Sequence, residues 1–297
     1  MKASNSKEIM TFGIEPNFAL YEINYALTDG IFPPTRKIKD AELRLRKVVR
    51  ETRLTGNDEQ TGKRIEQPVT LTFYVPYALN PQAESILLAI IKLSGIKGIK
   101  IEPDEPRLPL FNVEGDATLK TTGKVICKQY QLLKTAGMGD GKRDYELLGY
   151  YLEQMAKVSV KWENHATGWK GMSHLIGYTT HDDGSLIVQL NWRLAGAIFG
   201  DYERAIIDLD ERYKLRKDAS KTLHRWLSAH LWKGKNEYIT YDKLRSHIWT
   251  QEATPAAQRW RLHTLKKEIL PELDKLSHWR VEMGKDGTKI SHLKDPK

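Results

Sequence analysis

The order of the predicted elements constrains the fold most, because three helices followed by a β-hairpin occur twice along the chain. In the first instance, helices are expected near residues 80–94, 128–136 and 144–157. Two alternating apolar segments follow them, and the turn residues Asp183 and Gly184 join a third segment to the second. Helices and a hairpin in this order are typical of a winged-helix module.

The second instance lies in the last third of the chain. Its first helix can be capped by Asp218 or Ser220, and Thr254 with Pro255 gives a strong start for its third helix. The elements expected after the first helix are two helices and two strands, at residues 241–249, 254–276, 279–283 and 288–292.

The repeated order predicts an α+β chain with two tandem winged-helix domains, at residues 67–200 and 201–297. A chain of 297 residues, 40% of them hydrophobic, is long enough to build a core in each domain. Residues 1–66 are expected to form a charged, partly irregular N-terminal arm. The stretch from Thr35 to Arg64 is highly charged and contains a turn-rich segment, so we expect it to pack poorly.

The residue content excludes several other classes of protein. The single cysteine, Cys127, rules out an internal disulfide and a thiolate-rich zinc site. The longest apolar run, Ile86–Ile91, is too short to span a bilayer, and the N-terminus lacks the apolar stretch of a secretory signal. We therefore expect a cytoplasmic protein with no membrane partner.

Sequence signals for catalysis are weak. The segment from Gly137 to Lys142 is rich in glycine, but its spacing does not match a phosphate-binding loop, so we interpret it as a turn. Asp208, Asp210 and Glu211 stand beside basic residues and are interpreted as a solvated linker. The nine histidines are scattered along the chain. We predict no catalytic residue, no metal and no cofactor, and hence not an enzyme. A primase or nicking enzyme would require a set of metal ligands.

The basic charge of the chain indicates a polyanionic partner. The formal net charge is +9, and residues 203–297 hold 21 Lys and Arg against 14 Asp and Glu. At 100° per residue, the helix expected at 254–276 has an apolar side and a basic side. The apolar side holds Leu262, Leu265, Ile269, Leu273 and Leu276, and the basic side holds Arg259, His263, Lys266 and Lys267. The helix is predicted to dock through its leucines and to present cations to the major groove of double-stranded DNA.

The candidate DNA-binding residues come from both predicted modules. We assign direct base readout to Arg259, Arg261 and His263. The other candidates are Thr254, Lys266, Lys267, Lys243, Arg245, Lys285 and Lys289 in the second module and Lys142 and Arg143 in the first. The alternative interpretation of the basic helix face is a solvated surface without a ligand.

The first module makes a weaker case for DNA contact. The outward side of its third helix mixes cations with Glu146 and Glu153, which repel phosphate. This helix therefore contacts DNA at its N-terminal end only, or its module serves in self-association. The wings are expected at residues 163–171 and 284–287. Three tryptophans are expected to pack in the core or the wing, and they are Trp162, Trp169 and Trp192.

Three stretches of the chain resemble a known family. They read LNWRLAGAIFGDYERAIIDLDERYKL, KTLHRWLSAHLW and IWTQEATPAAQRWRLHTLKKEILPELDKLSHWRVE. They resemble the RepC replication initiators of IncQ-type plasmids and, more distantly, iteron-binding Rep proteins such as TrfA and RepE. The resemblance extends from about Arg64 to the C-terminus.

The resemblance implies a plasmid replication initiator in the bacterial cytoplasm. Such a protein binds iterons, the direct repeats of the origin, with a pair of winged-helix domains and promotes opening of an adjacent AT-rich region. The implied partners are the plasmid-encoded helicase and primase, and a homodimer is a further expectation. By the same resemblance, the readout helices fall on residues 142–157 and 254–276. The alternative is a winged-helix transcriptional regulator, which shares every structural feature above.

Overall fold

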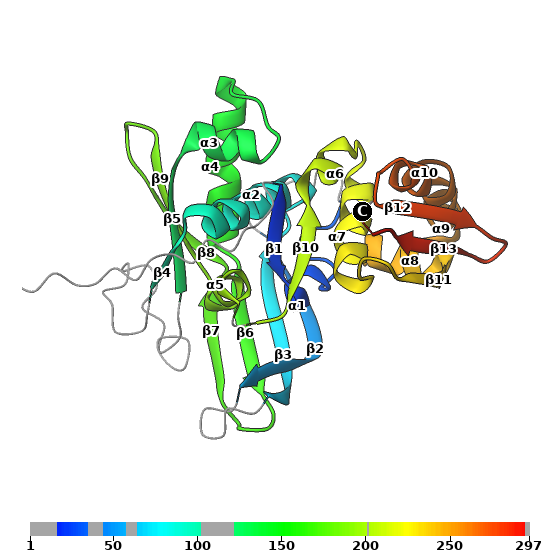
Figure 1. Cartoon of the computed structure of the whole chain (residues 1–297), viewed down its shortest axis with the longest axis horizontal. Coiled ribbons are helices and arrows are strands. Elements are labelled where there is room, and N and C mark those ends of the chain that lie inside the picture. The colour runs from blue at the N-terminus through cyan, green and yellow to red at the C-terminus, as the bar shows by residue number, and fades with distance from the viewer. Residues whose placement is uncertain (1–16, 35–43, 58–63, 102–121, 201, 295–297) are drawn as a thin grey trace, which may run out of the picture.

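The structure of the 297-residue chain is a computed structural model that describes residues 17–34, 44–57, 64–101, 122–200 and 202–294. In these residues the chain is a mixed α+β protein with antiparallel strand pairs (Figure 1). Its buried apolar residues form two clusters that divide near Leu215. We call residues 215–294 the second lobe and the described residues before them the first lobe.

The first lobe is built around one buried helix, α2 (Pro81–Lys97). Asn80 caps this helix, since its side chain accepts hydrogen bonds from the backbone N–H groups of Gln82 and Ala83. The apolar run Ile86–Ile91 is fully buried in the core of the first lobe, so core packing accounts for its apolar character. The elements packed around α2 include α3 (Gln129–Thr135), α4 (Lys142–Ala156), α5 (Trp192–Phe199) and the sheet β4 (Ile99–Ile101), β5 (Thr122–Lys128), β9 (Ser185–Leu190) and β8 (Ile176–Thr180).

A second sheet of the first lobe extends away from α2, towards the bottom of Figure 1. Its order is β2 (Leu45–Asn57), β3 (Arg64–Pro76), β6 (Ser159–Asn164) and β7 (Lys170–His174). Val48 faces Phe73 across β2 and β3, and Phe73 faces Val160 across β3 and β6. The expected wing at residues 163–171 is therefore the tip of a hairpin in this sheet, and it is not part of the sheet that contains β8 and β9.

The expectation of a poorly packed N-terminal arm is wrong for the residues described. Strand β1 (Phe18–Glu22) pairs with β10 (Arg204–Asp208), and α1 (Ile23–Ala26) follows it directly. Tyr21 and Tyr25 are 1% exposed and belong to the core of the first lobe. Residues 1–16, 35–43 and 58–63 of the expected arm lie outside the described residues.

The helices and strands of the second lobe lie close to the positions expected from the sequence. It contains α7 (Asp218–His230), α8 (Tyr241–Ile248), α9 (Pro255–Thr264), a π-helical turn (Leu265–Ile269), α10 (Leu270–Asp274), β12 (Trp279–Met283) and β13 (Gly287–His292), with the additional strand β11 (Asn236–Thr240). Thr254 caps α9, because its hydroxyl accepts a hydrogen bond from the N–H of Ala257. The hairpin β12–β13 and the long third helix are thus confirmed.

The π-helical turn has a local cause. Pro271 has no N–H, and its ring would clash with the carbonyl of Lys267 in a regular α-helix. The N–H of Leu270 instead donates to the carbonyl of Leu265, five residues earlier. The wider turn keeps Leu265, Ile269 and Leu270 buried in the core of the second lobe.

The same order of elements occurs in both lobes. A helix, a strand, two helices and two strands appear as α2–β5–α3–α4–β8–β9 and as α7–β11–α8–α9/α10–β12–β13. In each sheet the last strand of the series lies between the other two, as β5–β9–β8 and as β11–β13–β12. The first lobe differs in two ways. Strand β4 lies between α2 and β5 and pairs with β5, and β6 and β7 are inserted between α4 and β8 and join β2 and β3.

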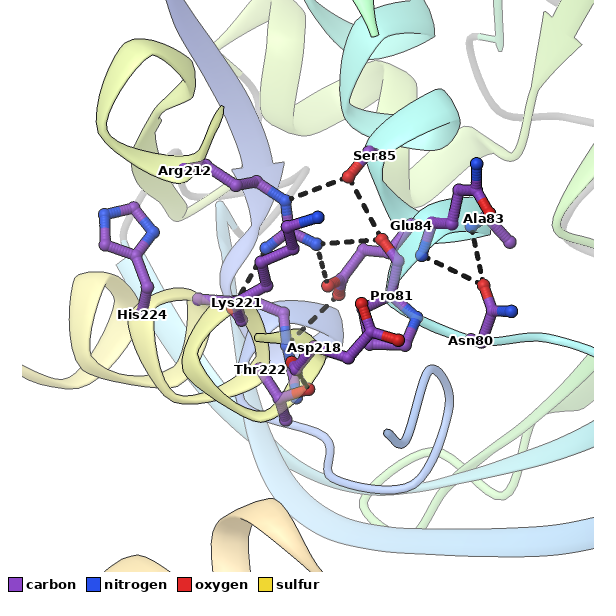
Figure 2. Close-up of polar contacts among 12 residues, drawn as sticks. Asn80, Pro81, Ala83, Glu84, Ser85, Arg212, Asp218, Lys221, Thr222 and His224 are labelled. Atoms are coloured by element: carbon purple, nitrogen blue, oxygen red, sulfur yellow. Dashed lines mark hydrogen bonds and ion pairs between the residues drawn. The ribbon is translucent and has the colours of Figure 1, made fainter. Parts of the chain in front are cut away.

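Buried charges join the two lobes. Figure 2 shows Arg212 of α6 (Leu209–Lys214) beside Glu84 of α2, with 2.7 Å between the guanidinium and the carboxylate. Arg212 also donates to the carbonyls of Pro81 and Lys221, at 3.2 and 3.0 Å. Arg225 of α7 lies 3.1 Å from the other oxygen of Glu84. We call Glu84, Arg212 and Arg225 the junction; all three side chains are 2% exposed or less.

The junction also holds the segment that follows α1. Arg225 donates to the carbonyls of Ala26 and Thr28, the latter at 3.1 Å. His247 of α8 lies 2.6 Å from a carboxylate oxygen of Asp29. Two helices of the second lobe, α7 and α8, are thereby tied to the first lobe.

Candidate nucleic-acid interface

Two helices of the second lobe meet at the candidate interface. Arg245 of α8 donates to the carbonyl of Gln258 in α9, at 3.0 Å, and forms an ion pair with Asp242. Its side chain is 21% exposed. Arg245 thus fixes α9 relative to α8 and keeps part of its guanidinium at the surface.

The start of α9 projects from the core. No side chain from Pro255 to His263 is buried, and the first buried one is Thr264. At 100° per residue, five exposed side chains fall on one side of the helix. We call them the α9 stripe, and they are Ala256, Arg259, Trp260, His263 and Lys267. The leucines expected on the opposite side, Leu265, Leu273 and Leu276, are buried.

Arg261 lies differently from Arg259. Its guanidinium donates to the carbonyl of Gln251 at 2.8 Å and stands 5.7 Å from the ring centre of Trp249. Partial burial, together with the like charge of Arg245, lowers the pKa of Arg261. Arg261, assigned to base readout together with Arg259, therefore folds back onto the turn before α9.

The hairpin β12–β13 lies against the start of α8. The hydroxyl of Tyr241 donates to the carbonyl of Gly284 at 2.7 Å, and the N–H of Tyr241 donates to the carbonyl of Asp286. The ammonium of Lys266 sits 4.0 Å from the ring centre of Tyr241. These contacts join α8, the π-helical turn and the β12–β13 hairpin. The exposed lysines on these segments include Lys243, Lys267, Lys285 and Lys289.

The equivalent helix of the first lobe carries a balanced charge. Lys142 and Arg143 are exposed at the start of α4, but Lys142 lies 3.9 Å from Glu146. Farther along the helix, Lys157 pairs with Glu153 at 2.6 Å. Because carboxylates accompany the cations, α4 offers a weaker field to phosphate than the α9 stripe does.

The three tryptophans named from the sequence have different environments. Trp162 and Trp192 are 5% and 6% exposed and pack edge to face, with 6.3 Å between ring centres. Their predicted place in the core is confirmed. Trp169 is 64% exposed at the tip of the hairpin β6–β7, so it does not belong to the core.

The acidic cluster after β10 is structural and is not a solvated linker. Asp208 caps α6, since its carboxylate accepts the N–H of Glu211 at 3.0 Å, and Asp210 contacts Asn17. Glu211 is buried and accepts hydrogen bonds from the indole of Trp279 and the backbone N–H of His278, at 3.0 and 2.9 Å. Burial raises the pKa of Glu211, but hydrogen bonds from His224 and His278 lower it to about 2.

Two carboxylates of this cluster, together with His278, could hold a metal ion. Single ligand atoms of Asp208, Glu211 and His278 lie within 4.8 Å of one another. Both oxygens of Glu211 already accept hydrogen bonds from His278, Trp279 or His224. The arrangement joins α6, α7 and β12, and we assign it a structural role.

Sequence reasoning missed Trp260 and the junction. Trp260 follows Ala256 by four residues and precedes His263 by three, so helical spacing places all three on one side. That spacing was the available signal, because Trp260 stands between two arginines in an otherwise basic segment.

None of the described helices is both long and apolar enough to cross a membrane.

Comparisons with known proteins identify a family and a similar solved fold. The family model described as Replication protein C (RepC) matches residues 67–292. A crystal structure of domain 2 and domain 3 of RctB, as a selenomethionine derivative, is similar with a TM-score of 0.51 and 11% identity, over 93% of this chain and 99% of that one. A structure of RctB domains 2-3 gives a TM-score of 0.47 at 11% identity, over 92% and 97% of the two chains. No curated protein sequence matches significantly.

Proposed function

Since this chain belongs to the Replication protein C (RepC) family, we propose that it initiates plasmid replication by binding iterons in the origin as double-stranded DNA. In this proposal, bound protein promotes opening of an adjacent AT-rich region and recruits the plasmid helicase and primase. It acts in the bacterial cytoplasm without a catalytic step, and a homodimer is one state in which it can bind. Membership of an initiator family supports the general role.

The α9 stripe is the observation that carries the proposal for DNA binding. It presents Arg259 and His263 on a helix end that projects from the core, and Lys267 follows one turn later in the π-helical turn. Such an end fits the major groove, where arginine donates to guanine and neighbouring cations hold phosphates. In addition, we assign phosphate contacts to other cations around the stripe, namely Lys243, Arg245, Lys266, Lys285 and Lys289.

The repeated order of elements supports two winged-helix modules in tandem. In this assignment α9 and α4 are the readout helices, and the turns of β12–β13 and β8–β9 are the wings. The first module contacts DNA through Lys142 and Arg143 at the start of α4. Since both modules lie on one chain and are joined at the junction, binding of the second module raises the effective concentration of the first at its site.

Footprinting on the plasmid origin tests the proposed function. We expect protection over direct repeats, together with permanganate-reactive thymines in the neighbouring AT-rich tract when the protein binds. The reactivity is expected because a protein that binds the distorted duplex better shifts DNA towards the open form.

The control fragment carries scrambled repeats beside the same AT-rich tract and should show neither signal. Protection of the repeats without reactive thymines would favour a transcriptional regulator over an initiator. No protection of any duplex would contradict DNA binding altogether.

A further inference from the structure

One apolar side chain stands within the cationic α9 stripe. Trp260 is 55% exposed and has Arg259 and His263 as neighbours on the same side of the helix. Single exposed apolar residues are common on protein surfaces and need no ligand. The position of Trp260 is informative because it lies on the helix end that projects from the core and among side chains that suit a polyanion.

The indole of Trp260 is held in place before any ligand binds. It packs against Trp249, with 6.2 Å between ring centres and 57° between planes. The guanidinium of Arg261 stands over Trp249 and donates to the carbonyl of Gln251, so Trp249 itself is fixed at the turn before α9. A side chain positioned in this way loses little conformational freedom when it contacts DNA.

Thymine is the base that offers an apolar group in the major groove. Its 5-methyl group is contacted by apolar side chains, whereas guanine and adenine offer hydrogen-bonding edges to arginine and amides. We infer that Trp260 reads thymine through its 5-methyl group, beside the polar contacts of Arg259. This inference rests on the proposed duplex binding and adds a determinant of sequence specificity to it.

The test compares thymine with uracil, which lacks only the methyl group. Duplexes are first selected from a random-sequence pool by the wild-type chain, and then each thymine is replaced by uracil one at a time. Burial of one methyl group corresponds to about a fourfold change in affinity. We expect the wild-type chain to lose about this factor at one or two positions of the selected site.

Variants at Trp260 identify the residue responsible. Trp260→Ala should bind the thymine and uracil duplexes equally well, whereas Trp260→Phe should keep a preference for thymine because the ring remains apolar. Trp232→Ala is the matched control: Trp232 is 66% exposed but lines a pocket with Phe18 and Ile206 of the first lobe. This control should discriminate between thymine and uracil as the wild type does.

The outcomes separate the inference from the proposed function. If the pool yields a specific duplex but Trp260→Ala keeps the full preference for thymine, the inference is wrong and duplex binding stands. The inference is also wrong, and duplex binding also stands, if the wild-type chain binds every uracil duplex as tightly as the thymine duplex. If no duplex is enriched, the proposed function fails and the inference fails with it.

Discussion

Replacing Glu84 by alanine is expected to lower the free energy of unfolding by about 3–5 kcal/mol, the loss measured when one partner of a buried ion pair is removed. Arg212 and Arg225 would keep their charges at sites that are 0% and 2% exposed. Water cannot reach these guanidinium groups to compensate. Glu84→Gln retains the side-chain volume but not the charge, so we expect it to be destabilising as well.

Urea unfolding followed by circular dichroism measures this effect. The matched control is Glu146→Ala on α4, whose carboxylate is 66% exposed and should contribute within about 0.5 kcal/mol. The wild-type chain should unfold in one transition, since the junction couples the lobes. A loss below about 1 kcal/mol for Glu84→Ala would show that the junction does not hold the lobes together.

The second lobe could be predicted from the sequence because its determinants are local. Leu265, Ile269 and Leu273 recur at helical spacing, and Thr254 with Pro255 marks the start of α9. Each of these signals acts within one or two turns of the chain. The π-helical turn at Leu265–Ile269 was not foreseen, although Pro271 supplies its cause.

The first strands could not be predicted because their partners are distant in the sequence. Phe18 pairs with Asp208, a partner that no local pattern indicates. The sequence of strand β2 is highly charged and suggests an exposed segment. In the structure, however, Arg46 donates to the carbonyl of Ile31 and Arg50 donates to the carbonyl of Leu27. Long basic side chains can lie along a partly buried strand in this way, so charge alone does not indicate a loose arm.

The junction escaped prediction for the same reason. Arg212 stands in a strongly charged stretch and resembles a solvated residue, but its partner Glu84 lies on another helix. At the candidate interface, the outward position of Arg259 followed from helical spacing. The position of Arg261 did not, because it depends on the path of the turn at Gln251.

Binding of the wild-type chain to an iteron duplex is expected to weaken by about 10³–10⁵-fold between 50 and 200 mM salt, if roughly six to ten phosphates are contacted. Each cation that neutralises a phosphate releases a condensed counterion, so log affinity falls linearly with log salt concentration. Residues 203–297 carry +7 of the net charge of +9, so the second lobe should account for most of this slope.

A double variant assigns part of the slope to cations at and around the α9 stripe. Lys267→Ala with Lys285→Ala should reduce its magnitude by up to about 1.8, since each lost phosphate contact removes about 0.9. Lys275→Ala, at the exposed end of α10, is the control and should leave the slope unchanged. Equal slopes for the double variant and the wild type would exclude phosphate contacts by Lys267 and Lys285.

Cleavage of DNA from a tethered iron chelate tests most directly whether α9 enters the groove. Cys127 is 5% exposed and burial raises the pKa of its thiol, so an introduced cysteine can be labelled selectively. Ala256→Cys places the label on the first turn of α9 and removes no charge. Lys275→Cys places it directly after α10, about 28 Å away at a rise of about 1.5 Å per residue.

The chelate at position 256 is expected to cut both strands within the protected repeat, at a few adjacent nucleotides of one major-groove face, while the chelate at position 275 cuts weakly or not at all. Equal cleavage from the two positions, or none from position 256 on a duplex that the protein protects, would contradict the claim that α9 reads DNA.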